Sequence, residues 1–142
     1  MSADANLRTA IFAHLSARDN LTALLGVGAA CRLYPDMIPT GTPLPYSRFV
    51  RVTNPRTYHM LGRSEVYHPT WQFDVWAATR AEAVAVLDAL ADELEAFSGP
   101  RSGVTVDRCF ITREGDVTQS EQDGGQDPAY SVGIDVEMWY HP

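Results

Sequence analysis

The sequence contains no lysine, since all eleven of its basic residues are arginine. No side chain is therefore available for a Schiff base, a lysine general base or the lysine contact of a P-loop. Cysteine is scarce as well, and Cys31 and Cys109 stand too far apart for a metal-spaced pair. We expect a cytosolic protein with two reduced, structural thiols, and a disulfide between them is the minority alternative.

Long apolar runs are also missing, because none approaches the roughly 20 residues that a membrane span requires. The first residues lack the cationic stretch and apolar core of a signal peptide, so we expect no membrane partner. Positive charge is in deficit, with 11 basic against 18 acidic side chains and a net charge of −7. That balance disfavours a protein that grips nucleic acid through its phosphates.

The length of 142 residues fits one domain, residues 1–142. Two main helices are predicted within it. The first begins near Asp4 and places Leu7, Ile11 and Leu15 on one face. The second begins at a Thr79-x-x-Glu82 capping box and continues with apolar residues at helical spacing as far as residue 97. A short helical turn, capped at residues 19–20 and stopped by Gly26, follows the first helix.

Strands are predicted where apolar and polar residues alternate, at 46–53, 66–77, 104–113 and 132–140, with a brief one at 31–34. Both faces of 46–53 are mixed, which is typical of an edge strand or of one that meets a partner chain. Long loops are expected at 35–45, 54–63 and 114–128. The order predicts an α+β fold, a mainly antiparallel sheet of about four to five strands with two main helices packed on one face.

No motif for catalysis, a cofactor or a metal is found. The sequence has no Gly-x-Ser-x-Gly elbow, and its closest histidines, His59 and His68, are nine residues apart. Asp74 and Asp135 could face each other as a carboxylate pair, although acidic residues that alternate along strands more often mark a solvated or subunit-facing surface. We therefore expect a protein that is not an enzyme and needs no cofactor.

Two tryptophans fall on the polar side of strand patterns, Trp76 beside Asp74 and Trp139 beside Glu137. A large apolar side chain in such a position indicates either a partner surface or a second layer of helices. The sequence pattern favours these two interpretations about equally.

Four stretches come in an order that resembles the tail-completion family of long-tailed bacteriophages and prophages, which is related in fold to phage tail terminators. They are "LRTAIFAHLSARDNLTALLG", "CRLYPDMIPTGTPLPYSRF", "QFDVWAATRAEAVAVLDALADELE" and the closing "YSVGIDVEMWYHP". The resemblance spans nearly the whole chain, and none of its motifs is catalytic.

The resemblance implies a structural protein that completes the tail tube and joins it to the head connector. Its expected partners are copies of itself in a ring, commonly a hexamer, together with the tail tube protein and the head–tail connector protein. DNA would pass through the ring without specific binding. The resemblance also implies a location in the host cytoplasm during assembly and then in the tail or neck of the virion.

Two sets of residues are candidates for these roles. For subunit interfaces they are Arg48, Arg51, Arg56, Tyr58, Met60, Arg63, Trp76 and Trp139. We expect the arginines to pair with acidic loops of a neighbour. For a channel-facing or mobile acidic loop, where carboxylates would repel passing DNA, the candidates are Glu114, Asp116, Glu121, Asp123 and Asp127.

Two other functions stay open at this point. The chain could be another head–tail connector or neck protein of similar size. It could also be a small ligand-binding or enzymatic α+β domain with a pocket formed by Asp74, Asp135 and nearby aromatic side chains.

Overall fold

The computed structural model describes residues 3–56, 58–63, 66–121 and 128–142. Its helices are α1 (Ala3–Leu15), α2 (Asp19–Leu25) and α3 (Arg80–Glu95), with a 3-10 turn η1 (Gly28–Ala30) after α2. The main sheet has six strands in the order β1 (Leu33–Pro35), β2 (Tyr46–Thr53), β5 (Thr70–Ala77), β8 (Pro128–His141), β7 (Val104–Glu121) and β6 (Gly99–Arg101).

The predicted α+β class is confirmed, but the predicted sheet of four to five strands is wrong. β1 adds a parallel partner to β2, whereas the other neighbouring strands of the main sheet are antiparallel. The sheet is therefore mixed. The brief strand predicted at 31–34 corresponds to β1. β6 was not predicted, because its three residues are too short to show an alternating pattern in the sequence.

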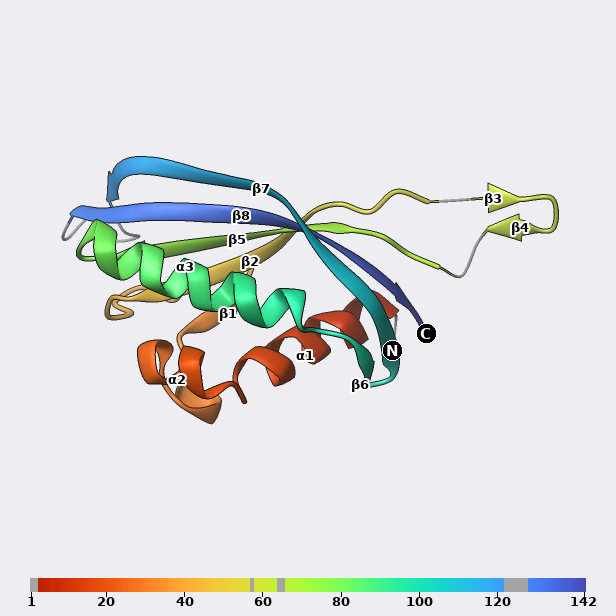
Figure 1. Cartoon of the computed structure of the whole chain (residues 1–142), viewed down its shortest axis with the longest axis horizontal. Helices are drawn as coiled ribbons and strands as arrows, with labels where there is room; N and C mark the ends of the chain where they lie inside the picture. Colours follow the sequence, from red (N-terminus) through yellow and green to blue (C-terminus); the bar gives the residue numbers. More distant parts are fainter. Residues whose placement is uncertain (1–2, 57, 64–65, 122–127) are drawn as a thin grey trace.

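The helices lie together on one face of the curled sheet, as predicted (Figure 1). Alternate positions of the strands supply the apolar layer beneath them, including Phe49, Trp71, Phe73, Ile134 and Val136. These side chains are about 0–1% exposed, so they form one core with the apolar faces of the helices. The opposite positions of the same strands consequently face away from the helices.

Local chemistry accounts for the ends of the helices. At the start of α3 the Thr79 hydroxyl accepts a hydrogen bond from the amide of Glu82 at 3.2 Å, which confirms the predicted cap. The predicted cap at residues 19–20 is wrong, because Arg18 occupies the N-cap of α2 and makes no side-chain capping bond. Gly26 ends α2 with φ of 104°, and a Cβ there would lie 2.6 Å from the carbonyl oxygen of Ala30.

His14 joins the two main helices. Its ring stacks on Phe97 with centroids 4.4 Å apart, and its Nε2 lies 2.9 Å from the carbonyl oxygen of Glu93. The side chain is buried, and burial lowers the pKa of His14. The neutral ring is thus the form that the fold favours.

Both cysteines are free and buried. Burial raises the pKa of the Cys31 thiol and raises that of Cys109 to about 12. The prediction of two structural thiols is confirmed, and the alternative of a disulfide is wrong. Such thiols are poor nucleophiles at neutral pH.

Two strand predictions need correction. β2 is not an edge along its whole length, because β1 pairs with it at Ser47–Phe49 on the side away from β5. The predicted loop at 114–128 is largely strand, since β7 continues to Glu121 and β8 begins at Pro128. The extension consists largely of polar residues, so alternation of apolar and polar residues did not predict it. It is stabilised by pairing between β7 and β8. Of the acidic candidates, Asp123 and Asp127 lie outside the described residues.

A second, two-stranded sheet stands apart from the main one. β3 (Tyr58–His59) pairs with β4 (Gly62–Arg63) across a turn at Met60 and Leu61. We call the segment Tyr58–Arg63, as far as it is described, the arm. It projects well beyond the end of the main sheet (Figure 1).

Candidate functional site

The candidate site is the sheet surface opposite the helices, which we call the helix-free face. It is formed by strand positions that alternate with the core: Arg48, Gln72, Asp74, Trp76, Phe110, Arg113, Asp135, Glu137 and Trp139. No helix of the described chain covers it (Figure 1). Of the two interpretations of Trp76 and Trp139, a second helical layer is therefore wrong.

At one end of this face, Arg48 and Asp74 are cross-strand partners of β2 and β5, with the guanidinium 2.8 Å from the Asp74 carboxylate. Gln72 donates a hydrogen bond to the other carboxylate oxygen at 2.9 Å. The guanidinium also lies 5.3 Å from the centre of the Trp76 ring, which in turn packs against Tyr46. These contacts hold Trp76 in a fixed position on the face, half-buried.

Gly133 makes this arrangement possible, and sequence reasoning missed it. It is the cross-strand partner of Asp74, and a Cβ at position 133 would lie 2.7 Å from Oδ1 of that carboxylate. The signal available in the sequence was a glycine inside a strong strand pattern, which marks close approach of another group.

The second tryptophan is fixed in a similar way. The Trp139 indole donates a hydrogen bond to the Glu137 carboxylate at 2.9 Å and stacks on His68 with centroids 4.4 Å apart. His68 Nδ1 lies 3.6 Å from the other oxygen of Glu137. The three side chains form one ordered cluster near the end of β8, with an aromatic surface that is half-buried.

Between the two clusters, Arg113 of β7 and Asp135 of β8 form a bidentate ion pair at 2.9 and 3.3 Å. The hydrogen bonds and charge of Asp135 raise the pKa of Arg113. Asp74 and Asp135, the carboxylates considered as a possible pocket, are thus each engaged by an arginine of the same chain. This arrangement is that of a sheet surface, not of two acids facing a substrate.

The remaining arginine candidates lie in other parts of the structure. Arg51 points to the helix side, where it contacts Asp4 of α1 at 2.8 Å. Arg56 is exposed before the arm, and Arg63 belongs to β4. Arg48 and Arg51 thus have partners within their own chain, whereas Arg56 and Arg63 are associated with the arm.

Tyr58 and Met60 are on the arm as well, and both are largely exposed.

The acidic candidates do not share one loop. Glu114 lines a hollow of about 460 Å³ with Arg80, Val84, Leu87 and Asp88 of α3 and with Gly115. Asp116 and Glu121 belong to β7.

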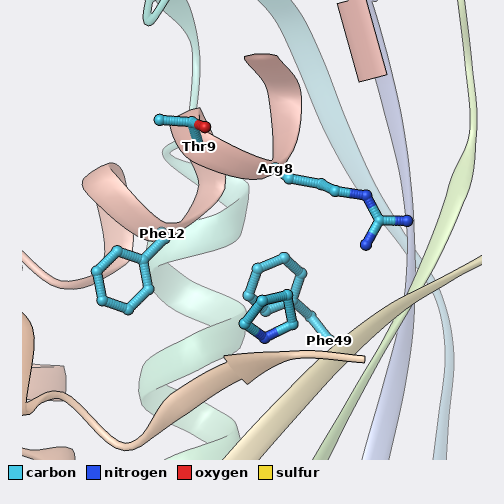
Figure 2. Close-up of a pocket in the computed structure, with 5 residues that line it drawn as sticks. Arg8, Thr9, Phe12 and Phe49 are labelled. Atoms are coloured by element: carbon cyan, nitrogen blue, oxygen red, sulfur yellow. The ribbon is translucent and has the colours of Figure 1, made fainter. Parts of the chain in front are cut away.

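A second hollow lies between α1 and the strands β1 and β2. It measures about 270 Å³ and is lined by Arg8, Thr9, Phe12, Pro35 and Phe49, which makes it mainly apolar. Figure 2 shows Arg8, Thr9 and Phe12 along α1 and Phe49 across from the helix, on the side of the sheet. No pattern in the sequence indicates this hollow, because its walls come from three elements. We call it the α1 pocket.

No group of three or more His, Cys, Asp or Glu side chains in the described part of the chain is placed to hold a metal ion. No helix found there is long and apolar enough to cross a membrane.

The profile of the family named Tail completion protein gp17 matches residues 9–141. The chain belongs to this family. Its members are structural, non-enzymatic components of phage tails, and the resemblance seen in the sequence is confirmed. An enzymatic α+β domain is therefore wrong as an alternative.

A solved structure described as the virion of a native gene transfer agent (GTA) particle contains a chain with the same fold. The TM-score is 0.76 at 18% identity, and the match covers 99% of this chain and 98% of that one. No curated protein matches the sequence. Because it belongs to the tail completion family, the chain is a virion component of a phage-like particle.

Proposed function

We propose that this tail completion protein forms a ring, a hexamer in the assembled virion, on the head-proximal end of the tail tube. The ring joins the tube to the head–tail connector protein and leaves a central passage for DNA. Assembly takes place in the host cytoplasm, before the finished tail meets the head. Family membership supports the role at the end of the tail.

The observation that carries this proposal is the helix-free face with its two ordered tryptophans. Trp76 and Trp139 are each fixed by a charged neighbour, Arg48 and Glu137, yet neither is covered by a helix. Aromatic residues held in one conformation lose little entropy on binding and are frequent hot spots of protein interfaces. We assign this face to contact with a neighbouring copy or with the tube protein.

The interface also includes the arm, with Tyr58 and Met60 at or near its tip and Arg56 and Arg63 beside them. A ring requires heterologous contacts, in which one surface of a subunit meets a different surface of the next. The helix-free face and the arm are two such different surfaces of one chain. Arg51, which contacts α1, contributes by fixing the helix layer and not by direct contact.

The acidity of the chain fits a DNA conduit. Carboxylates that line a passage repel phosphates and keep DNA from adhering to the wall. We assign this role to Asp116 and Glu121 of β7 and to Asp123 and Asp127, which follow β7 in the sequence and lie outside the described residues. Glu114 is a weaker candidate, because it lines the hollow beside α3.

The test is deletion of the gene from a complete particle gene cluster, followed by electron microscopy and fractionation. Filled heads and separate tails are expected, and the intact gene supplied from a plasmid should restore joined particles. In cells that make no heads, the protein should co-purify with tails. Co-purification with heads in cells that make no tails would instead identify a neck protein, the alternative role, and joined particles without the gene would contradict both.

A further inference from the structure

The arm exposes apolar surface that its own chain does not cover. Met60 is fully exposed at its tip, and Tyr58 is 71% exposed. The two strands have two residues each, and a hairpin so small is at best marginally stable on its own. Such an apolar tip on an isolated hairpin indicates a segment that becomes buried in an assembly.

Charge also sets the arm apart from the rest of the chain. The arm and the three residues before it, 55–63, contain Arg56 and Arg63 and no carboxylate, whereas the whole chain carries a net charge of −7. The remainder of the molecule is therefore more acidic than the chain average, and a second copy carries a net charge opposite to that of this segment. Attraction of this kind guides association and fixes orientation.

The α1 pocket has the matching chemistry. Phe12, Pro35 and Phe49 give it an apolar wall, and a flexible methionine side chain adapts well to an irregular apolar space. At its edge, the Asp36 carboxylate accepts two hydrogen bonds from Arg8 at 3.0 Å. The Asp36 side chain is still 55% exposed, so the carboxylate can also receive a cation from outside.

We propose that the arm of one copy docks into the α1 pocket of the next copy, with Met60 in the pocket and Arg56 beside Asp36. The arm projects away from the body of its own chain, which favours a contact between chains (Figure 1). Arm and pocket are different surfaces of the same chain, so the contact is head-to-tail and repeats around a ring. The inference rests on the proposed ring and names the surfaces that close it.

A disulfide trap tests this contact in particles assembled from the complete gene cluster. Thr9 is exposed at the pocket and Met60 at the arm tip, so the double variant Thr9→Cys with Met60→Cys places one thiol on each surface. Both native cysteines are buried, which keeps background oxidation low. Oxidised particles should yield a ladder of covalent oligomers on a non-reducing gel, up to the number of copies in the ring.

Three controls make the result specific. Each single variant should lose the ladder, because a bond from arm to pocket needs both thiols. Val27→Cys with Met60→Cys is the matched pair, since Val27 is 73% exposed outside the pocket, and it should give no ladder. The variant Met60→Asp in the wild-type background should lower the yield of joined particles while the isolated protein unfolds at an unchanged temperature.

The outcomes separate the docking from the ring itself. A ring seen by electron microscopy in oxidised particles, with no Thr9–Met60 ladder, would overturn the docking and leave the proposed function intact. A ladder in the Val27 pair as strong as in the Thr9 pair, or a bond from Met60→Cys to the tube protein, would also overturn it. Particles that contain the chain but no ring would overturn the proposed function as well.

Discussion

Arg48 and Asp74 face each other across β2 and β5, and their ion pair of 2.8 Å is the structural centre of the helix-free face. Asp74 is 8% exposed, and its carboxylate is held from two sides, by Arg48 and by Gln72. The same guanidinium lies over Trp76. One arginine thus compensates a buried charge and positions an aromatic side chain on the surface that we assign to assembly.

Replacing Arg48→Met should lower the free energy of unfolding by about 1–3 kcal/mol, because a nearly buried carboxylate loses its charged partner. Urea unfolding measures the change. Arg113→Met is the matched control. The ion pair between Arg113 and Asp135 is more exposed, so its removal should lower the free energy of unfolding by less. If both variants lowered the free energy of unfolding equally, the burial of Asp74 would not contribute to the cost of losing its partner.

Gly133→Ala should destabilise the protein by about 1–3 kcal/mol, since the added Cβ would lie 2.7 Å from Asp74 Oδ1 and must displace it. Gly115→Ala is the control, because the added Cβ would lie equally close, 2.6 Å, to a nitrogen at the end of the Arg113 side chain. That flexible side chain is exposed and can move, so the control should lose much less stability. Thermal unfolding of the two variants compares them, and the prediction is wrong if Gly115→Ala is the worse of the two.

Stability should fall as the pH falls through about 6.5, the ordinary pKa of histidine, because burial lowers the pKa of His14 in the folded chain. Below that pH the unfolded chain takes up a proton that the folded His14 resists. His14→Gln should remove this part of the pH dependence between pH 5 and 7.5, as urea unfolding at several pH values would measure. His141→Gln, at an exposed ring beside Asp107, should keep it. A slope unchanged by His14→Gln would contradict the assignment.

Replacing Asp116, Glu121, Asp123 and Asp127 together by their amides should leave particles joined but slow the release of DNA. Removing these carboxylates lets phosphates come closer to the wall of the passage. The rate of DNA ejection in vitro is the measurement, and Glu114→Gln serves as the control with little expected effect. An ejection rate equal to that of the wild type would contradict the assignment of these four carboxylates to the wall of the passage.

Trp139→Ser should reduce the yield of joined particles more than it reduces stability, because the indole is held at the surface by Glu137 and His68. Particle counts by electron microscopy and a thermal unfolding curve give the two quantities. Val27→Ser changes an exposed apolar residue elsewhere and should alter neither. A Trp139 variant that joins heads to tails normally would argue against the helix-free face as an interface.

Sequence patterns predicted the elements whose signals are local. The bounds of β2 agree with the predicted 46–53, and the start of α3 follows from the hydroxyl of Thr79 and the amide of Glu82. Features that depend on distant segments were not predictable in this way. β6 forms because it pairs with β7, and β7 extends through polar residues because β8 pairs with it.

Of the residues on the helix-free face, Arg48, Trp76 and Trp139 were predicted from the sequence as interface candidates, but the layout of that face was not predicted. Trp76 and Trp139 were identified from alternation alone, yet the pattern could not show that helices cover only the other face. Arg48 and Arg51 are separated by three positions in a strand, an odd number, and therefore lie on opposite sides of the sheet. The α1 pocket was missed because Phe12 and Phe49 meet only through the tertiary fold.

Electron cryomicroscopy of the head–tail joint in assembled particles tests the central claim most directly. The account predicts one ring of six copies of this chain between the last ring of the tail tube and the head connector, with the helix-free face in contact with protein and an open passage at the centre. A joint in which this chain is absent, or present without forming a closed ring, would contradict it.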